Sequence, residues 1–308
     1  MIERITIIGT GLIGTSVGLA LRNGGFAGTI AGYDASAMEM RTALQMGAVG
    51  HALRDEAEAL AFAASADVVV LAVPVFAILD WMQKLGPIMK AGQLVTDTGS
   101  TKLEIAQAAA KHFGADGAAF LPGHPMAGKE SGGAALGEAA LFQNAMWLFT
   151  PLDRPQTPME DEWRSAVAQF GCRTKDLDAQ RHDTLCAWVS HLPQMVSTAL
   201  SALLEDEFGK VNEMRDDLLA VGGRALREMT RLGASPYSMW RDVAMSNTAP
   251  LAETLLALEQ RLAHLRENLK TPELREEFAR ANRFRFSADA VIAKNDVPAC
   301  KKEDGSNG

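Results

Sequence analysis

Cysteine is scarce in this sequence, with only Cys172, Cys186 and Cys300 among 308 residues. None of the three stands in a CxxC spacing, and an odd number leaves one thiol without a partner. The pattern supports neither a disulfide framework nor a zinc site, so no bound metal is expected. A reducing cytoplasm is the expected compartment.

Long apolar runs and an excess of basic residues are also missing. The most apolar stretch, 68–79, is interrupted by Pro74 and is far shorter than the roughly 20 residues that span a bilayer. The first residues enter a strand with no basic region ahead of it, so we expect no signal peptide. Lys and Arg number 30 against 38 Asp and Glu, a formal net charge of −8. That balance disfavours nucleic acid and anionic membranes as partners.

Aromatic residues make up only 6% of the chain, but hydrophobic residues reach 47% and charged residues 22%. These proportions are typical of a globular protein. At roughly 150 residues per domain, the length predicts two domains.

Short β-branched runs alternate with helical patterns through the first half of the chain. The alternation indicates βαβ units and a doubly wound parallel sheet with both faces covered. Expected strands cover 4–8, 29–33, 68–73 and 94–96, with helices at 16–22, 38–46 and 78–89. Weaker signals continue as strands at 119–121, 147–150 and 173–175 and a helix at 161–170.

The pattern changes near residue 178, where strand-like runs end. Apolar residues then recur at helical spacing in 184–204, 211–230, 237–246 and 251–269. We therefore predict a dinucleotide-binding domain over 1–178 and an all-helical domain over 179–285. The polar tail 286–308 is predicted to be disordered.

A glycine-rich turn lies between the first strand and the first helix. Such a turn allows a tight bend, close approach of a pyrophosphate and close helix packing, and the helix N-terminus favours phosphate. Asp34 follows the second strand, where a carboxylate binds ribose hydroxyls and repels a 2′-phosphate, so NAD is favoured over NADP. FAD is the rival ligand. The candidate cofactor residues in the turn are Gly9, Thr10, Gly11, Leu12, Ile13 and Gly14.

Two further segments lie at the same expected sheet edge. Val73 and Pro74 end the third strand, as a simple terminator or as a contact on the nicotinamide side. Ser100 lies in the segment DTGSTK, where a hydroxyl can cap a helix or act in catalysis. His124 lies in GHPMAG, which we interpret as a loop carrying a general base.

These motifs, taken in order, resemble the prephenate and arogenate dehydrogenase family of tyrosine biosynthesis. The resemblance extends from about residue 5 to residue 262 through GTGLIGTS, DTGSTK, GHPMAG, HDTLCAWVSHLP and TRLGASPYSMWRD. It implies a Rossmann-type domain, a helical dimerisation domain and a homodimer. The implied reaction is oxidative decarboxylation of a cyclohexadienyl substrate with NAD.

The resemblance also implies roles for individual residues. His124 accepts the hydrogen bond of the substrate hydroxyl, and Ser100 orients His124 and the nicotinamide end of the cofactor. Arg231 binds a substrate carboxylate through its guanidinium fork. His191 lies at a proline kink over the substrate, although alone it reads as a buried core histidine. Trp240 is either a wall of the pocket or part of the core of an interface.

Three departures from the family pattern bear on the substrate. Gln194 stands where prephenate-using members have a second histidine, which favours use of arogenate. Ala225 and Glu228 alter a neighbouring segment, and Lys129 replaces a threonine. His182 matches a His-Asp pair of the family, without a role that the sequence defines.

Two other functional classes remain open at this point. A β-hydroxyacid dehydrogenase or imine reductase would share the glycine turn and a helical second domain, but no lysine stands out between residues 180 and 247. A catalytically inactive dinucleotide sensor would need none of His124, Ser100 and Arg231.

Overall fold

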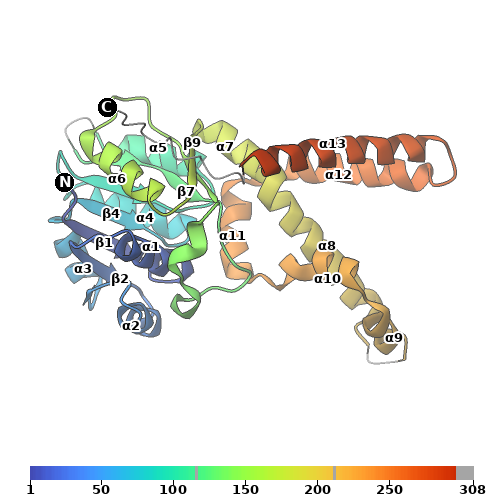
Figure 1. Cartoon of the computed structure of the whole chain (residues 1–308), viewed down its shortest axis with the longest axis horizontal. Helices are drawn as coiled ribbons and strands as arrows, with labels where there is room; N and C mark the ends of the chain where they lie inside the picture. Colours follow the sequence, from blue (N-terminus) through green and yellow to red (C-terminus); the bar gives the residue numbers. More distant parts are fainter. Residues whose placement is uncertain (115–116, 211–212, 296–308) are drawn as a thin grey trace, which may run out of the picture. The chain divides into compact units, whose positions relative to one another are not determined.

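The computed structural model describes residues 1–114, 117–210 and 213–295. By its internal contacts the chain divides into two compact units, Met1–Thr254 and the part from Leu255 onward. The first unit begins with an α/β region and continues with helices (Figure 1). Within the described residues, no helix is both long and apolar enough to cross a membrane.

A six-stranded sheet organises the α/β region, and all its strands are parallel. The strand order is β3-β2-β1-β4-β5-β6. Strands β2 and β3 follow one another on one side of β1, and β4, β5 and β6 follow one another on its other side. This arrangement leaves a crevice at the carboxyl ends of β1 and β4, where such sheets bind ligands. The strands are β1 (Arg4–Ile8), β2 (Thr29–Tyr33), β3 (His51–Ala52), β4 (Val68–Leu71), β5 (Leu94–Asp97) and β6 (Ala119–Leu121).

Helices cover both faces of this sheet, which confirms the doubly wound fold. Residues of α1, α2 and α6 pack on one face, and residues of α3, α4 and α5 pack on the other. The four residues of β4 are all buried, as expected for a strand between two layers. The helices are α1 (Leu12–Asn23), α2 (Ala37–Gln45), α3 (Glu56–Ala63), α4 (Val75–Leu85), α5 (Leu103–His112) and α6 (Pro158–Ala168).

A second, three-stranded sheet follows, in the order β7-β8-β9. Its strands are β7 (Gly123–Pro125), β8 (Met146–Phe149) and β9 (Arg173–Asp176), with β7 antiparallel to β8 and β8 parallel to β9. The prediction of a loop around His124 is wrong, because this segment pairs with β8. Three residues are too few to show the alternation by which a strand is recognised.

The first helical segment after β9 begins earlier than predicted and is not continuous. Helix α7 (Ala179–Cys186) begins behind Asp178, whose carboxylate accepts a hydrogen bond from the Arg181 amide at 2.8 Å. A π-helical turn, Ala187–His191, then leads into α8 (Leu192–Phe208). Pro193 has no amide hydrogen to donate to the preceding turn, and the helix widens to a π-helical turn just before it, at the place where the sequence predicted a kink.

The segment predicted as one helix over 211–230 is broken. Helix α9 (Glu213–Val221) and helix α10 (Arg224–Thr230) are separated by Gly222 and Gly223, because two glycines disfavour a helix interior. A 3-10 turn, Arg231–Ala234, and then α11 (Tyr237–Ser246) follow. Two further 3-10 turns, Ala134–Leu136 and Ala139–Phe142, lie against α1.

The helical region continues further toward the C-terminus than the sequence suggested, because a second helix, α13, follows α12. Helices α12 (Thr248–Glu267) and α13 (Glu273–Asn295) lie side by side, and an Arg261–Glu277 ion pair of 2.9 Å links them (Figure 1). The prediction of disorder from residue 286 is wrong up to Asn295, because no proline or glycine interrupts the chain between Pro272 and Pro298. The remainder of the predicted tail, 296–308, lies outside the described residues.

Candidate functional site

The glycine turn after β1 has a geometry that only glycine permits at two positions. Gly9 has φ +90°, and a Cβ there would lie 2.3 Å from the Ala72 carbonyl oxygen. A Cβ on Gly14 would lie 1.8 Å from the Gly9 carbonyl oxygen, so α1 can pack on the turn only with glycine there. Gly11 faces open space. In the part of the chain that the structure describes, no side chain caps the N-terminus of α1, which suits a phosphate ligand.

Asp34 lies directly after β2, beside the glycine turn. Its carboxylate accepts hydrogen bonds from the Thr10 amide at 2.7 Å and the Ser36 amide at 2.8 Å. A cavity of about 330 Å³ is lined by Gly9, Gly11, Asp34, Val73 and Pro74 among others. The turn and the carboxylate therefore fit the adenosine half of a dinucleotide. Of the other predicted cofactor residues, Thr10, Leu12 and Gly14 are buried in or behind the turn, and Ile13 is half-buried.

A second cavity, of about 360 Å³, lies between β7 and the helices that follow β9. Its lining residues come from separate parts of the chain and include five predicted site residues: Ser100, His124, Gln194, Arg231 and Trp240. His191 does not line it. That side chain is buried, with Nδ1 3.1 Å from Nδ2 of Asn247 and its ring edge-on to Trp240. His191 thus lies behind the cavity wall formed by Trp240.

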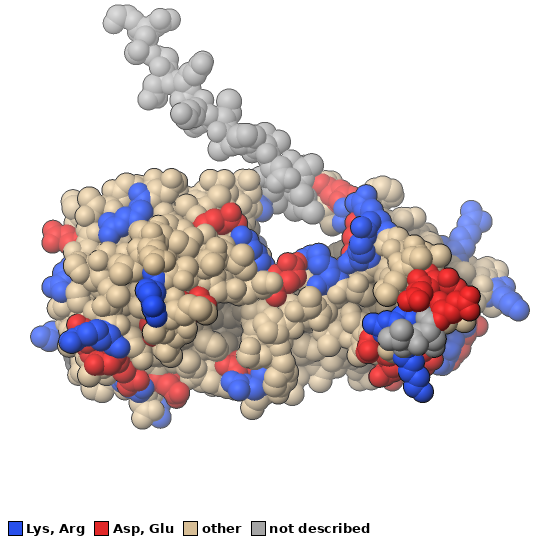
Figure 2. Space-filling view, turned by 90° about the horizontal axis from the view of Figure 1, so that it is seen from below, with Lys and Arg blue, Asp and Glu red and all other residues tan. Residues whose placement is uncertain are grey.

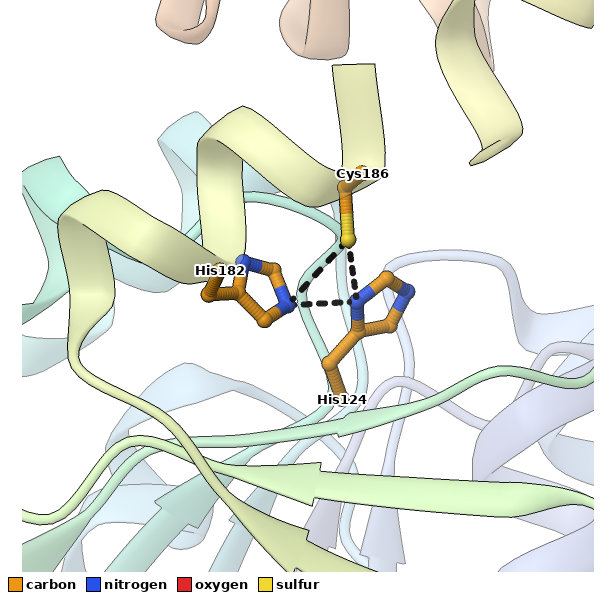
Figure 3. A group of neighbouring side chains, drawn as sticks. All are labelled: His124, His182 and Cys186. Carbon is orange, nitrogen blue, oxygen red and sulfur yellow. Dashed lines mark hydrogen bonds between the residues drawn. The ribbon is translucent and has the colours of Figure 1, made fainter. Parts of the chain in front are cut away.

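His124 is held from behind by a second histidine (Figure 3). Its Nδ1 lies 2.9 Å from Nε2 of His182, and His182 Nδ1 lies 2.8 Å from the Asp183 carboxylate. A carboxylate only accepts, so His182 donates through Nδ1 and accepts through Nε2. His124 must then donate through Nδ1, which leaves its Nε2 with a free lone pair. The chain of hydrogen bonds fixes His124 as a base.

Burial lowers the pKa of His124 well below the usual range, and the nearby His182 and Lys102 lower it further. The pKa of His182 is also lowered, chiefly by burial. Both rings are therefore neutral near pH 7, the state that the hydrogen-bonding pattern requires. Among the described residues, His124 is hydrogen-bonded to His182 and not to Ser100. Ser100 lies on the wall of the same cavity, and its role in orienting His124 and the nicotinamide end of the cofactor stays a prediction.

Asp183 has a second role that the sequence did not reveal. Its two carboxylate oxygens accept hydrogen bonds from the backbone amides of Lys102 at 2.7 Å and Leu103 at 2.9 Å. Asp183 on α7 thereby caps the start of α5, in place of the Ser100 cap that we considered. The dipeptide His182-Asp183 was visible in the sequence, but its partners are distant in the chain. His124 precedes His182 by 58 residues, and Lys102 precedes Asp183 by 81.

A buried ion pair lies next to this cap. Lys102 and Asp97 are both 0% exposed, and the ammonium contacts the carboxylate directly. Asp97 also accepts from the Gly99 amide at 2.7 Å and the Gly123 amide at 3.2 Å, which links the end of β5 to the start of β7. Burial raises the pKa of Asp97 and lowers that of Lys102, while their mutual attraction opposes both shifts. The pair positions the strand that carries His124.

Arg231 lies at the rim of the second cavity and is 59% exposed along its side chain. Its guanidinium forms an ion pair with Glu130, which lines the same cavity. Lys129, the residue that departs from the family pattern, pairs instead with Glu138 at 2.8 Å. The ion pair with Glu130 involves one guanidinium nitrogen, Nη1, and the guanidinium has further N–H donors that a carboxylate ligand can bind.

Acidic and basic side chains are interspersed over the surface that Figure 2 shows. On that face, the described residues form no continuous basic patch. At the second cavity two basic side chains, Lys129 and Arg231, lie in the wall, and each forms an ion pair with a glutamate.

Comparisons with known proteins identify the family. Residues 17–175 match the nucleotide-binding domain of prephenate dehydrogenase, and residues 178–283 match its dimerization domain. A prephenate dehydrogenase of Lactococcus lactis subsp. cremoris is 31% identical over 246 residues, 80% of this chain. This chain spans 65% of the length of that relative.

Solved structures agree with this result. Synechocystis arogenate dehydrogenase is 27% identical, with a TM-score of 0.74 over 92% of this chain and 99% of that one. Prephenate dehydrogenase from A. aeolicus, in complex with hydroxyphenyl propionate and NAD+, is 26% identical, with a TM-score of 0.80 over 96% and 99%. The glycine turn, the histidine-lined cavity and these matches together show that the chain belongs to the prephenate dehydrogenase family.

Proposed function

We propose that this protein is an oxidoreductase that converts prephenate or arogenate by NAD-dependent oxidative decarboxylation. The observation that carries the proposal is a neutral histidine, with its tautomer fixed by His182 and Asp183, in a cavity that also contains Arg231. The readings as a β-hydroxyacid dehydrogenase, an imine reductase or an inactive sensor are not favoured, because both domains match prephenate dehydrogenase.

The residues at the second cavity have separate roles in this reaction. Arg231 binds a substrate carboxylate and orients the ring. His124 accepts the proton of the ring hydroxyl at Nε2, and His182 stabilises the resulting imidazolium by accepting from Nδ1. Bound NAD would supply the hydride acceptor, held at the glycine turn and Asp34. Loss of the ring carboxylate as CO₂ then yields the aromatic product.

The direct test is to mix the purified protein with NAD⁺ and prephenate, and separately with NAD⁺ and arogenate. Formation of NADH, followed by its absorbance, is expected with at least one of the two substrates. The organic product should be 4-hydroxyphenylpyruvate or tyrosine, respectively. No NADH with either substrate would contradict the proposal.

The pH dependence follows from the lowered pKa of His124. A base must be unprotonated to act, and a lowered pKa keeps it unprotonated as the pH falls. We expect kcat/KM to stay level from about pH 8 down through 6.5, the ordinary histidine value, and to decline only in more acidic buffer. A decline with an apparent pKa at or above that ordinary value would show that His124 is not the titrating base.

The preference for NAD over NADP is predicted to depend on the charge of Asp34. Asp34→Ser should lower the ratio of kcat/KM for NAD⁺ to that for NADP⁺ by about tenfold or more, since each 1.4 kcal/mol of repulsion removed is a factor of ten. Asp34→Asn is the matched variant, because it keeps the size and an acceptor for the Thr10 amide while removing the charge. Equal use of both cofactors by the unmodified enzyme would overturn this role of Asp34.

The choice between the two substrates is predicted to involve Gln194. Its amide nitrogen donates to the Leu232 carbonyl at 2.7 Å and to the Thr198 hydroxyl at 3.2 Å. Its amide oxygen accepts from the Ser235 hydroxyl at 3.3 Å, and the second lone pair of that oxygen is the remaining acceptor for a ligand. That oxygen can accept from the ammonium group of arogenate, whereas a protonated histidine would repel it and donate to the keto group of prephenate. We therefore propose that arogenate is used at least as well as prephenate.

The variant Gln194→His should shift the ratio of kcat/KM values toward prephenate by roughly 5- to 150-fold, the equivalent of about 1–3 kcal/mol. Steady-state measurements with both substrates in both proteins test this shift. Thr198→Ala is a useful companion, because it removes one partner of Gln194 without introducing an ionisable group. An unchanged ratio in Gln194→His would show that position 194 does not select the substrate.

We also propose that the protein is a homodimer. Residues 178–283 match a dimerization domain, and α8 to α11 expose large apolar side chains that a monomer would leave in water. These include Leu203, Leu219, Val221, Met229 and Tyr237. Light scattering on the full chain should give twice the monomer mass.

We also propose a cytoplasmic location, which the free thiols of Cys172 and Cys186 fit.

A further inference from the structure

Three potential metal ligands, His124, His182 and Cys186, lie close together behind the second cavity (Figure 3). His182 and Cys186 are four residues apart on α7, so they lie on the same face of that helix. His124 reaches them from β7. All three side chains are buried, and their ligand atoms lie within 4.8 Å of one another. The sequence did not suggest this group, because the ligands come from segments 58 residues apart.

The distances within this group are close to those of a tetrahedral site. Zinc–nitrogen bonds of about 2.0–2.1 Å and zinc–sulfur bonds of about 2.3 Å place neighbouring ligand atoms roughly 3.3–3.6 Å apart. The sulfur of Cys186 lies 3.6 Å from His182 Nε2 and 3.9 Å from His124 Nδ1, and the two nitrogens are 2.9 Å apart. Shifts of about half an ångström would bring all three to bonding positions.

The surroundings also suit a divalent ion. Asp183 binds the far nitrogen of His182 at 2.8 Å, the carboxylate–histidine arrangement that orients ligating histidines. The charges balance as well. A divalent cation, the Cys186 thiolate and the Asp183 carboxylate sum to zero, and the nearby Lys102 ammonium is already paired with Asp97.

We propose that His124, His182 and Cys186 bind a divalent transition-metal ion such as Zn²⁺, and that this ion inhibits the enzyme. Binding replaces the hydrogen bond between the two histidines with two metal–nitrogen bonds, and the Cys186 thiol loses its proton to solvent. The proton on His124 Nδ1 moves to Nε2, because Nδ1 then bonds to the metal. His124 thereby loses the lone pair that accepts the substrate proton. This inhibitory effect rests on the proposed function, whereas the binding does not.

Binding is tested separately from activity. Chelator-treated full-length protein is titrated with Co²⁺, whose bond to a thiolate gives a charge-transfer absorption band, and with Zn²⁺ by calorimetry. We expect one ion per chain. Loss of a residue that only supports a metal ligand typically weakens metal binding by about 10- to 100-fold. Cys186→Ala removes a ligand itself, so the metal affinity should fall by at least that factor and the absorption band should disappear.

The other cysteines provide matched controls. Cys172→Ala and Cys300→Ala should keep both the band and the affinity. Cys186→Ser, which preserves the size of the side chain, should lose the band like Cys186→Ala, and circular dichroism verifies the fold of each variant. Absence of the band in the unmodified protein, or its persistence in Cys186→Ala, would overturn the metal site.

Activity supplies the second readout. Zn²⁺ should inhibit the unmodified enzyme in a way that chelator reverses, and Cys186→Ala should resist inhibition at the same concentration. If the ion binds with the expected band but leaves NADH formation unchanged, the inhibitory role is overturned while the site remains. If no variant forms NADH even without metal, the proposed function fails independently of the binding result.

Discussion

Replacing His124 with alanine is expected to lower kcat by about 10²–10⁴-fold, the range for loss of a general base, with a much smaller change in substrate binding. The structure gives the physical reason. His124 is buried with its Nδ1 committed to His182, so its Nε2 is the group positioned to take a proton in the second cavity. Steady-state kinetics with NAD⁺ and the better substrate measure the change.

Two variants show whether the loss is specific. His51→Ala, at an exposed position in β3, should leave kcat unchanged. Arg231→Ala should mainly raise KM, because it removes a binding contact that is made before and during the reaction. Near-normal turnover of His124→Ala would show that another group is the base.

Lys102→Met is expected to lower the free energy of unfolding by about 3–5 kcal/mol, the typical cost of breaking a buried ion pair from one side. The variant leaves the Asp97 carboxylate 0% exposed, and among the described residues its remaining hydrogen-bond donors are the Gly99 and Gly123 amides. Urea denaturation of each variant measures the loss. The destabilisation should appear even though Lys102 contacts neither cavity.

The matched control is Lys84→Met. Lys84 pairs with Glu56 at 2.8 Å, but both side chains are exposed, and such pairs contribute about 0–1 kcal/mol. In the double variant Asp97→Asn with Lys102→Met, both charges are gone and the amide oxygen can still accept from one of the two glycine amides, so part of the stability should return. If Lys102→Met were as stable as Lys84→Met, the Lys102–Asp97 pair would not stabilise the contact between the end of β5 and the start of β7.

Local signals were enough to predict many elements of the fold. The strands Arg4–Ile8 and Thr29–Tyr33 and the helix Tyr237–Ser246 have the predicted bounds, because each has a clear apolar pattern within its own residues. Strand β7 has only three residues, and the break at Gly222 and Gly223 interrupts an otherwise helical pattern. Helix α13 is rich in charged residues and exposes Phe278, Phe284 and Phe286, so its sequence gave no apolar stripe to recognise.

The candidate site was predictable only in part, for a different reason. His124, Ser100 and Arg231 stand in recognisable motifs, and the structure brings them to one cavity. What holds them there depends on partners distant in the chain. Asp97 and Lys102 are close in sequence, but their burial is a property of the folded molecule. The hydrogen bond from His124 to His182 and the pairing of Arg231 with Glu130 likewise exist only after folding.

The position of Asp183 has a consequence for how the two halves of the enzyme can evolve. The Asp183 carboxylate caps the first turn of α5, in the nucleotide-binding half. The same carboxylate fixes which ring nitrogens of His182 and His124 carry protons. A slip of α7 along α5 would release both at once, so a misaligned junction yields a protein that is inactive as well as less stable. A chimera that joins this N-terminal half to the helical half of a relative would therefore regain turnover only when an aspartate returns to register with the amides of residues 102 and 103.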